Sequence, residues 1–168
     1  MESFPLINTV ILEKFMLKFE SEIKIRAAEP SRFIKKFNEA IGRDFQYLFS
    51  KVYVGSEKIE FENTPLSFLM IWNFYEIIKN AVIFISPKKK TISIAYSIDF
   101  SSYLIFWCIT SLLIVAIELL NGINDLLILF LPLLWCGIAF LFTMISQMKF
   151  RGKVLEAVKM SDGKVITY

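Results

Sequence analysis

The chain has 168 residues, a length typical of one domain, and a formal net charge of +3. Hydrophobic residues make up 55% of it, above the roughly 45–50% of soluble domains. A nucleic-acid-binding domain is usually more basic, so we expect no nucleic-acid partner. Histidine, the commonest general base and metal ligand, is absent from the sequence, as are glycine-rich phosphate loops and the Gly-x-Ser-x-Gly motif. We therefore expect a non-enzymatic protein without a metal site or a cofactor.

Residues 1–100 have the pattern of a water-soluble α+β domain built on an antiparallel sheet. Apolar and polar side chains alternate along residues 15–27, which predicts a half-buried strand. Pro30 suits a first helical turn, an apolar stripe at helical spacing follows it, and Gly42 is expected to stop the helix. The stripe that should pack on the sheet consists of Phe33, Ile34, Phe37, Ala40 and Ile41.

Short strands separated by turn residues follow this helix. Lys51–Val54 and Lys58–Glu62 flank a turn at Gly55 and Ser56, which predicts a hairpin. Residues 80–86 and Thr91–Asp99 flank a second turn at residues 87–90, and every second side chain of Thr91–Asp99 is apolar or aromatic. Residues 67–72 form one more short apolar segment.

Two apolar stretches, residues 102–121 and 126–148, come after the domain. Each has the ~20 residues that a helix needs to cross ~30 Å of hydrocarbon. Glu118 and Asp125 are the charged residues of the region 102–148, and the connector 121–125 fits only a tight turn. We predict a transmembrane helical hairpin over residues 101–148, with the buried core of a soluble protein as the alternative. Glu118 lies about one turn from the outer interface, where its carboxylate can reach water.

Basic residues precede the first apolar stretch and follow the second, and none lies in the connector between the two. The positive-inside bias then predicts a two-pass protein of the cell inner membrane with both termini in the cytoplasm. A cation near the membrane surface gains ~1 kcal/mol from anionic lipid, although a solvated turn also explains the lysine triplet. The candidates for contact with lipid headgroups are Lys88, Lys89, Lys90, Lys149, Arg151 and Lys153.

Small side chains in both stretches permit close approach of helices, which is how helices associate in lipid. These residues do not all lie on one seam, and Trp107 and Trp135 are easier to explain against a neighbouring subunit than against lipid alone. We therefore expect a homo-oligomer or membership of a larger membrane assembly. The candidates for helix–helix contact are Ser111, Ala116, Gly137 and Ala139.

The tail, residues 149–168, is placed on the cytoplasmic side. Ser161, Asp162 and Gly163 form a turn between residues 154–160 and 164–167. This pattern favours a small β-hairpin that docks on the sheet, with a frayed helix end as the alternative.

Three runs in the first domain resemble bacterial YcxB-like proteins: residues 59–63 (IEFEN), 71–78 (IWNFYEII) and 82–89 (VIFISPKK). Members of that family are small membrane proteins with a transmembrane hairpin and an antiparallel cytoplasmic domain related to bacterial PH-like folds. In that family the hairpin usually precedes the strands, whereas here it follows them. The resemblance covers residues 58–100, implies a PH-like sheet, and implies no catalytic residue.

Two functions remain open from the sequence. The first is a membrane-anchored interaction module that presents its domain at the inner membrane face to lipid headgroups, to its own copies or to a larger complex. The second is an oligomeric, membrane-permeabilising effector of the defence or toxin type, gated by its cytoplasmic domain. Two helices cannot line a pore alone, so the second function requires a ring of subunits. An enzyme acting on lipid ranks third.

Overall fold

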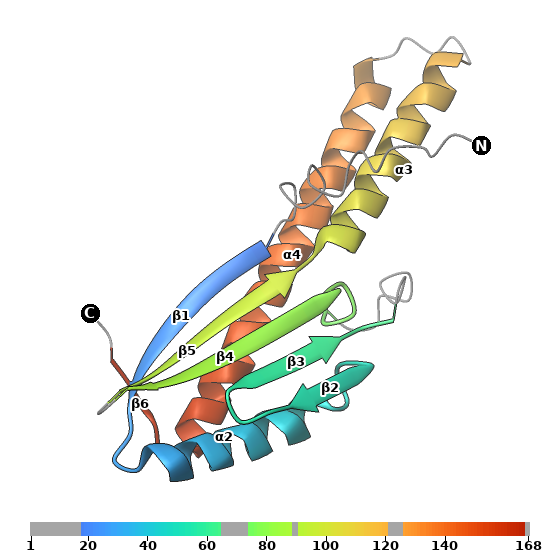
Figure 1. Ribbon diagram of the computed structural model, residues 1–168. Helices are drawn as coiled ribbons and strands as arrows, with labels where there is room; N and C mark the ends of the chain where they lie inside the picture. The colour runs from blue at the N-terminus through green and yellow to red at the C-terminus, as the bar shows by residue number, and fades with distance from the viewer. Residues whose placement is uncertain (1–17, 65–73, 89–90, 121–125, 167–168) are drawn as a thin grey trace, which may run out of the picture.

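The computed structural model describes residues 18–64, 74–88, 91–120 and 126–166, and its described part is an α+β structure with a six-stranded antiparallel sheet (Figure 1). The sheet order is β2-β3-β4-β5-β1-β6. The predicted apolar segment 67–72, the start of the first predicted strand, Lys89, Lys90 and the connector fall outside the described ranges. The elements are β1 (Lys18–Arg26), α2 (Pro30–Phe45), β2 (Lys51–Val54), β3 (Lys58–Glu62), β4 (Asn80–Lys88), β5 (Thr91–Asp99), α3 (Ser101–Leu120), α4 (Leu126–Met160) and β6 (Lys164–Val165).

The predicted alternating strands are confirmed. In β1, Ile23 and Ile25 are buried, whereas the neighbouring residues Glu22 and Lys24 are exposed. Both predicted hairpins form, because β2 pairs antiparallel with β3 and β4 pairs antiparallel with β5. Side chains on successive strand residues point to opposite faces, so each strand contributes one row to the core and one row to the other face.

The α2 helix is longer than the sequence predicts. It begins at Pro30 as expected, but it passes through Gly42 and ends at Phe45. The Phe45 ring is fully buried, with centroids 4.9 Å from the ring of Phe61 and 5.2 Å from that of Phe150. A glycine inside a helix costs about 1 kcal/mol, which is less than burial of a phenylalanine ring contributes. Ile34 of the predicted stripe is only partly buried.

The α4 helix corrects the prediction of a β-hairpin in the tail. It is 35 residues long and includes residues 154–160, which were predicted to form a strand. Val154, Ala157 and Val158 lie on its buried face together with Phe150, at the spacing of a helix in contact with a core. The second predicted strand of the tail is present in shortened form as β6, and it docks on the sheet through Val165 opposite Ile25.

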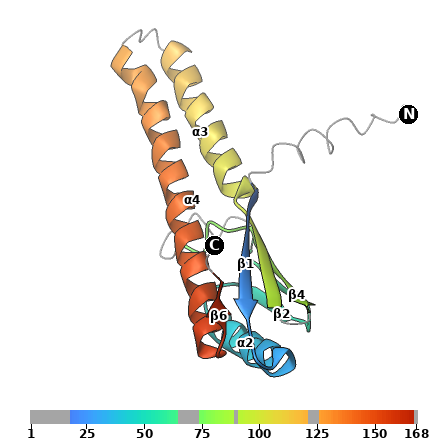
Figure 2. The ribbon, with the colours of Figure 1, turned by 90° about the vertical axis from the view of Figure 1, so that its left-hand side faces the viewer.

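The helices cover one face of the sheet. Figure 2 shows the C-terminal half of α4 on one side of the strands, with α2 beside its end. The core between these layers is rich in aromatic rings, and Phe61, Tyr96 and Phe150 are almost fully enclosed. Among the described residues no helix lies over the opposite face, where the side chain of Phe84 is 46% exposed. The sheet therefore has one covered and one open face.

Candidate functional site

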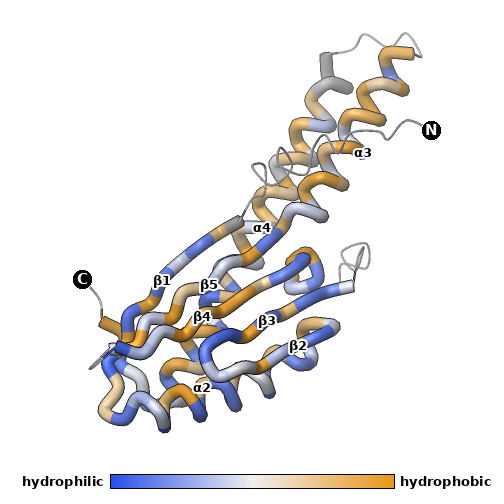
Figure 3. The backbone as a smooth tube through the Cα atoms, in the orientation of Figure 1, coloured by the Kyte–Doolittle hydropathy of each residue, from blue (hydrophilic) through white to orange (hydrophobic). Residues whose placement is uncertain are grey.

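Two helices of this protein are long and apolar enough to cross a membrane. They are α3 and the part of α4 that begins at Pro132. Figure 3 shows hydrophobic residues along both helices above the sheet. Only 11% of the most apolar stretch of α3 and 22% of that of α4 is buried inside the molecule. The core helix of a soluble protein would be mostly buried, so this apolar surface needs another covering.

A polar contact and an aromatic stack join α3 and α4 across the seam between them. Ser111 is 6% exposed, and its Oγ lies 3.5 Å from the Sγ of Cys136. The indole rings of Trp107 and Trp135 stack across the same seam, with centroids 5.3 Å apart and an interplanar angle of 7°. Each indole therefore has a partner within one chain, although Trp135 is still 43% exposed.

The four predicted helix-contact residues divide into two pairs. Ser111 and Ala139 are buried between α3 and α4 within one chain. Ala116 and Gly137 face outward, and a Cβ atom added to Gly137 would meet no described atom within 4 Å. The inward pair therefore holds the hairpin together, and the outward pair is open to lipid or to another chain.

A small cluster joins the hairpin to the domain. The Ser146 hydroxyl on α4 donates a 2.7 Å hydrogen bond to the backbone carbonyl of Phe74, in the turn before β4. The ring of Phe74 stacks on that of Phe142 at 5.4 Å, and the Nζ atom of Lys149 lies 3.9 Å from its centroid. The cluster therefore connects the middle of α4 to the domain at the boundary between the apolar part of α4 and its core-packed end.

Two of the predicted lipid-contacting cations lie beside this boundary. Lys149 and Arg151 are exposed on the turn of α4 that follows Ser146, on the domain side of the Ser146–Phe74 hydrogen bond. At 1.5 Å of rise per residue, they lie within about 8 Å of Ser146 along the helix axis. Lys153 is half-buried and forms an ion pair with Glu156 at 3.0 Å. The structure therefore places both cations next to the junction between the apolar hairpin and the domain.

Lys88 lies at the end of the domain away from α3, whereas the sequence predicted a position just ahead of the hairpin. It is the last residue of β4 and pairs with Thr91, the first residue of β5. The nine residues of β5 separate this turn from α3, a distance of about 30 Å at 3.3 Å per residue. Closeness in the sequence suggested closeness to the hairpin, but the extended strand β5 carries the chain away from it.

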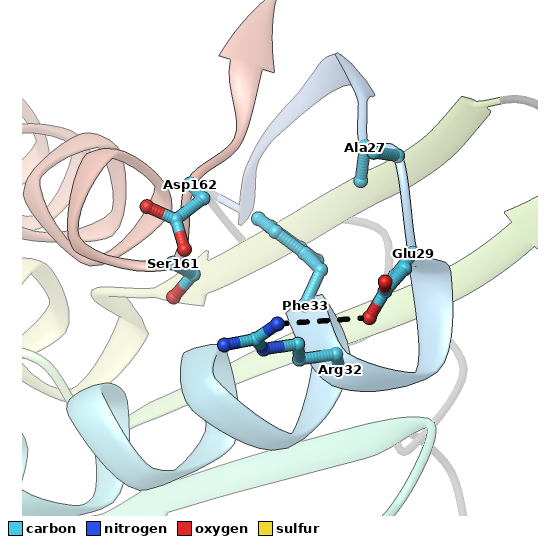
Figure 4. Close-up of a pocket in the computed structure, with 7 residues that line it drawn as sticks. Ala27, Glu29, Arg32, Phe33, Ser161 and Asp162 are labelled. Carbon is cyan, nitrogen blue, oxygen red and sulfur yellow. Dashed lines mark ion pairs between the residues drawn. The ribbon is translucent and has the colours of Figure 1, made fainter.

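A polar hollow of about 180 Å³ lies at that far end, next to the start of α2 (Figure 4). Glu29 and Arg32 come from α2 and its cap and form an ion pair at 3.9 Å, while Ser161 and Asp162 come from the end of α4. Asp162 is paired with Lys36 at 2.6 Å, and this hydrogen bond and charge hold the pKa of the Asp162 carboxyl below its usual range. Sequence reasoning missed the hollow because it unites residues from both ends of the chain.

The described residues contain no cluster of Cys, Asp or Glu able to hold a metal ion. The part of the chain that the structure describes offers an apolar hairpin, a basic boundary and a polar far end. Compared with known proteins, the chain matches no family model, no curated protein and no solved structure.

Proposed function

We propose that this protein is a two-pass membrane-anchored interaction module, which presents its α+β domain at the inner face of the membrane. The observation that carries the proposal is the continuity of α4. Its first part is apolar and exposed beside α3, and its last part is a core helix of the domain, with Phe150 and Val154 fully buried. One rigid helix of about 52 Å, at 1.5 Å per residue, then fixes the domain relative to the bilayer.

The lipid boundary falls between Ser146 and Arg151 in this proposal. The apolar outward surface above it is covered by lipid, and the exposed cations Lys149 and Arg151 contact anionic headgroups, each worth ~1 kcal/mol. The ring of Phe74 lies under Lys149 and provides an aromatic group at interface depth. Both termini are cytoplasmic, and the domain is of the PH-like class that the YcxB-like resemblance implies.

A membrane-permeabilising effector is less well supported. A water-filled pore needs polar side chains on the face that lines it. The hydroxyls of Ser111, Thr143 and Ser146 are buried within one chain. The large outward side chains of the described helices, such as Leu112, Leu133 and Leu141, are apolar.

Site-directed cysteine labelling tests the topology. Cys108 and Cys136 are replaced by alanine, and single cysteines are placed at Asn124 and Ser56. A membrane-impermeant maleimide added to intact cells should label the Asn124 position and reach the Ser56 position only after lysis. Labelling of the Ser56 position in intact cells would overturn the orientation, and recovery of the chain in the carbonate-soluble fraction would overturn membrane insertion.

A liposome assay distinguishes the two functions. The purified full chain is reconstituted into vesicles loaded with a self-quenching dye. An interaction module leaves the dye trapped at every protein-to-lipid ratio, whereas a permeabilising effector releases it with a steep dependence on that ratio. Release would therefore replace the first function with the second.

A further inference from the structure

A row of cations crosses the open face of the sheet at the end far from α3. Arg26 lies directly opposite Lys164 in the β1·β6 register, and Lys88 lies opposite Thr91 in the β4·β5 register. Arg26, Thr91 and Lys164 also line one hollow of about 710 Å³. Arg26 follows the buried Ile25, so its side chain points away from the core, toward the open face. We call Arg26, Lys88 and Lys164 the distal basic row.

The charges of this row are not balanced within the described part of the chain. Neither Arg26 nor Lys164 forms an ion pair there, and like charges directly opposite each other in a sheet are destabilising. The acid that lines the same hollow, Asp162, is already paired with Lys36. The row therefore carries a local electrostatic cost that an anionic ligand would remove.

Lipid of the membrane that holds the hairpin does not reach this row. The row lies about 30 Å from the start of α3, the length of the nine-residue strand β5. This distance is more than three times the ~8 Å Debye length at physiological ionic strength, so the surface potential of the membrane is screened there. The exclusion of lipid here, and of a second copy of the chain below, rests on the membrane crossing proposed above.

A second copy of the chain is also a poor partner for the row. The strands run in the same general direction as the hairpin, because β5 leads into α3 through a single residue (Figure 1). Copies inserted the same way in one membrane are related by an axis along the membrane normal, which places equal levels of the two sheets opposite each other. Face-to-face contact would then oppose the distal basic row with itself, and Glu20 with Glu20.

Carboxylates fit the distal basic row better than a nucleic acid does. The hollow is lined by Ala27, Ala28 and Pro30 besides its charged and hydroxyl residues, so it offers no aromatic ring on which bases stack. The guanidinium of Arg26 can bind a carboxylate through two parallel hydrogen bonds, and Lys164 provides a second charge directly beside it. We propose that the distal basic row docks an acidic segment of a protein partner in the cytoplasm.

The proposal is tested with a fluorescein-labelled peptide containing six glutamates in a Gly/Ser background. Its fluorescence anisotropy is measured with the full chain in nanodiscs of zwitterionic lipid, at low ionic strength. The peptide should bind, and the Arg26→Gln/Lys164→Gln double variant should bind about tenfold more weakly or worse, a loss of ~1.4 kcal/mol. A polythymidine of equal charge should bind no more tightly than the peptide.

The matched control is the double variant Lys149→Gln/Arg151→Gln, which removes one lysine and one arginine beside the membrane boundary. It should bind the peptide within about twofold of the original chain, a change below ~0.5 kcal/mol. Absence of peptide binding, equal losses in the two double variants, or tighter binding of polythymidine that the Arg26/Lys164 change abolishes would each overturn the proposal. A reversed orientation in the topology experiment leaves this measurement unaffected, since the peptide binds a surface of the domain that a nanodisc exposes in either orientation.

A melting experiment keeps the test independent of folding defects. Removing one of two opposed cations relieves their repulsion, so Arg26→Gln should melt at or above the temperature of the original chain. The glutamate peptide should raise the melting temperature of the original chain but not that of the double variant. A double variant that the peptide stabilises as much as the original chain contradicts the proposed site.

Discussion

The Ser146 hydroxyl and the Phe74 carbonyl form a 2.7 Å hydrogen bond between α4 and the turn before β4, and Ser146 is fully buried. A buried hydroxyl that loses its acceptor, or a carbonyl beside it that loses its donor, costs about 1–3 kcal/mol where water cannot replace the lost partner. Ser146→Ala should therefore lower the free energy of unfolding by about that amount. Amide hydrogen exchange in detergent should also become faster in residues 74–78, which the bond holds against α4.

Thr143→Val is the matched control, since Thr143 is equally buried but its hydroxyl bonds to Phe140 of its own helix at 2.7 Å. It should leave exchange in residues 74–78 unchanged. Equal acceleration of exchange by both variants would show that the Ser146 bond does not tie the domain to the hairpin.

The face of α2 that packs on the core predicts a large effect at Phe37. Its ring is fully buried and stacks on Phe33 with centroids 5.8 Å apart. Phe37→Ala should cost about 3–5 kcal/mol in chemical unfolding, through lost burial and the cavity that remains. Tyr47→Ala is the control, because Tyr47 is 82% exposed and its removal should change stability by less than about 0.5 kcal/mol. An unchanged melting temperature for Phe37→Ala would mean that this face is not packed.

Two glycines of the tail should respond to alanine in opposite directions. A Cβ atom at Gly163 would lie 2.6 Å from the ring of Phe33 and 2.9 Å from the side chain of Ile25, so Gly163→Ala should destabilise by about 1–3 kcal/mol. Gly152 is exposed inside α4 with no described atom within 4 Å of such a Cβ. Gly152→Ala should stabilise by about 0.5–1 kcal/mol, because alanine loses less entropy in a helix. If both variants melted above the original chain, or both below it, the packing of Gly163 against Phe33 and Ile25 would be refuted.

Alkaline pH should weaken the domain through Tyr75. Burial first, and the carboxylate of Glu156 second, raise the pKa of Tyr75 to about 12. A raised folded-state pKa contributes stability that is complete below the unfolded value near 10 and is lost as the pH rises through 12. Over that window the loss is at most about 3 kcal/mol, from two pKa units at ~1.4 kcal/mol each.

Tyr75→Phe keeps the ring but removes the ionisable hydroxyl, so its unfolding free energy should fall less steeply between pH 10 and 12. The slopes are compared by chemical unfolding at several pH values, since the two proteins already differ at neutral pH. Parallel slopes would show that Tyr75 ionises as readily in the folded domain as in the unfolded chain.

The elements that the sequence predicted correctly are those whose periodicity is local. Alternation along Thr91–Asp99 identifies Ile92, Ile94, Tyr96 and Ile98 as buried, and all four are. The two apolar helices also follow from residue type alone, because few charges interrupt them. The local sequence pattern failed to predict where a helix ends when tertiary packing determines that end. Gly42 does not stop α2, since burial of Phe45 one turn later outweighs the cost of a glycine.

The tail contained a signal that was overlooked. Phe150, Val154, Ala157 and Val158 follow the spacing of a helix with one buried face, and this pattern continues the second apolar stretch without a break. No comparable sequence pattern indicates the distal basic row. It depends on the pairing of Arg26 with Lys164, from opposite ends of the chain, and a two-residue strand leaves too short a pattern to predict a partner.

Self-association through the outward face of the hairpin gives the last prediction. Lipid provides no hydrophobic drive for helices to associate, so contact between chains in a membrane depends on close approach at small residues. Ser111 and Ala139 are already used within one chain, which leaves Gly137 and Ala116 as the small outward residues among the predicted four. Apart from its chain neighbours and its own helix backbone, no described atom lies within 4 Å of a Cβ at Gly137, so Gly137→Leu should leave the fold of the single chain unchanged.

Gly137→Leu should nevertheless lower the mass of the detergent-solubilised particle, measured by light scattering, because a leucine there forces neighbouring backbones apart. Ala139→Leu is the contrasting variant: Ala139 is 2% exposed between α3 and α4, so a larger side chain should lower the melting temperature whether or not chains associate. This pair of variants separates contact between chains from contact within one. A particle that has the mass of one chain before and after the Gly137 change, with no partner co-purifying from cells, would rule out assembly through this face.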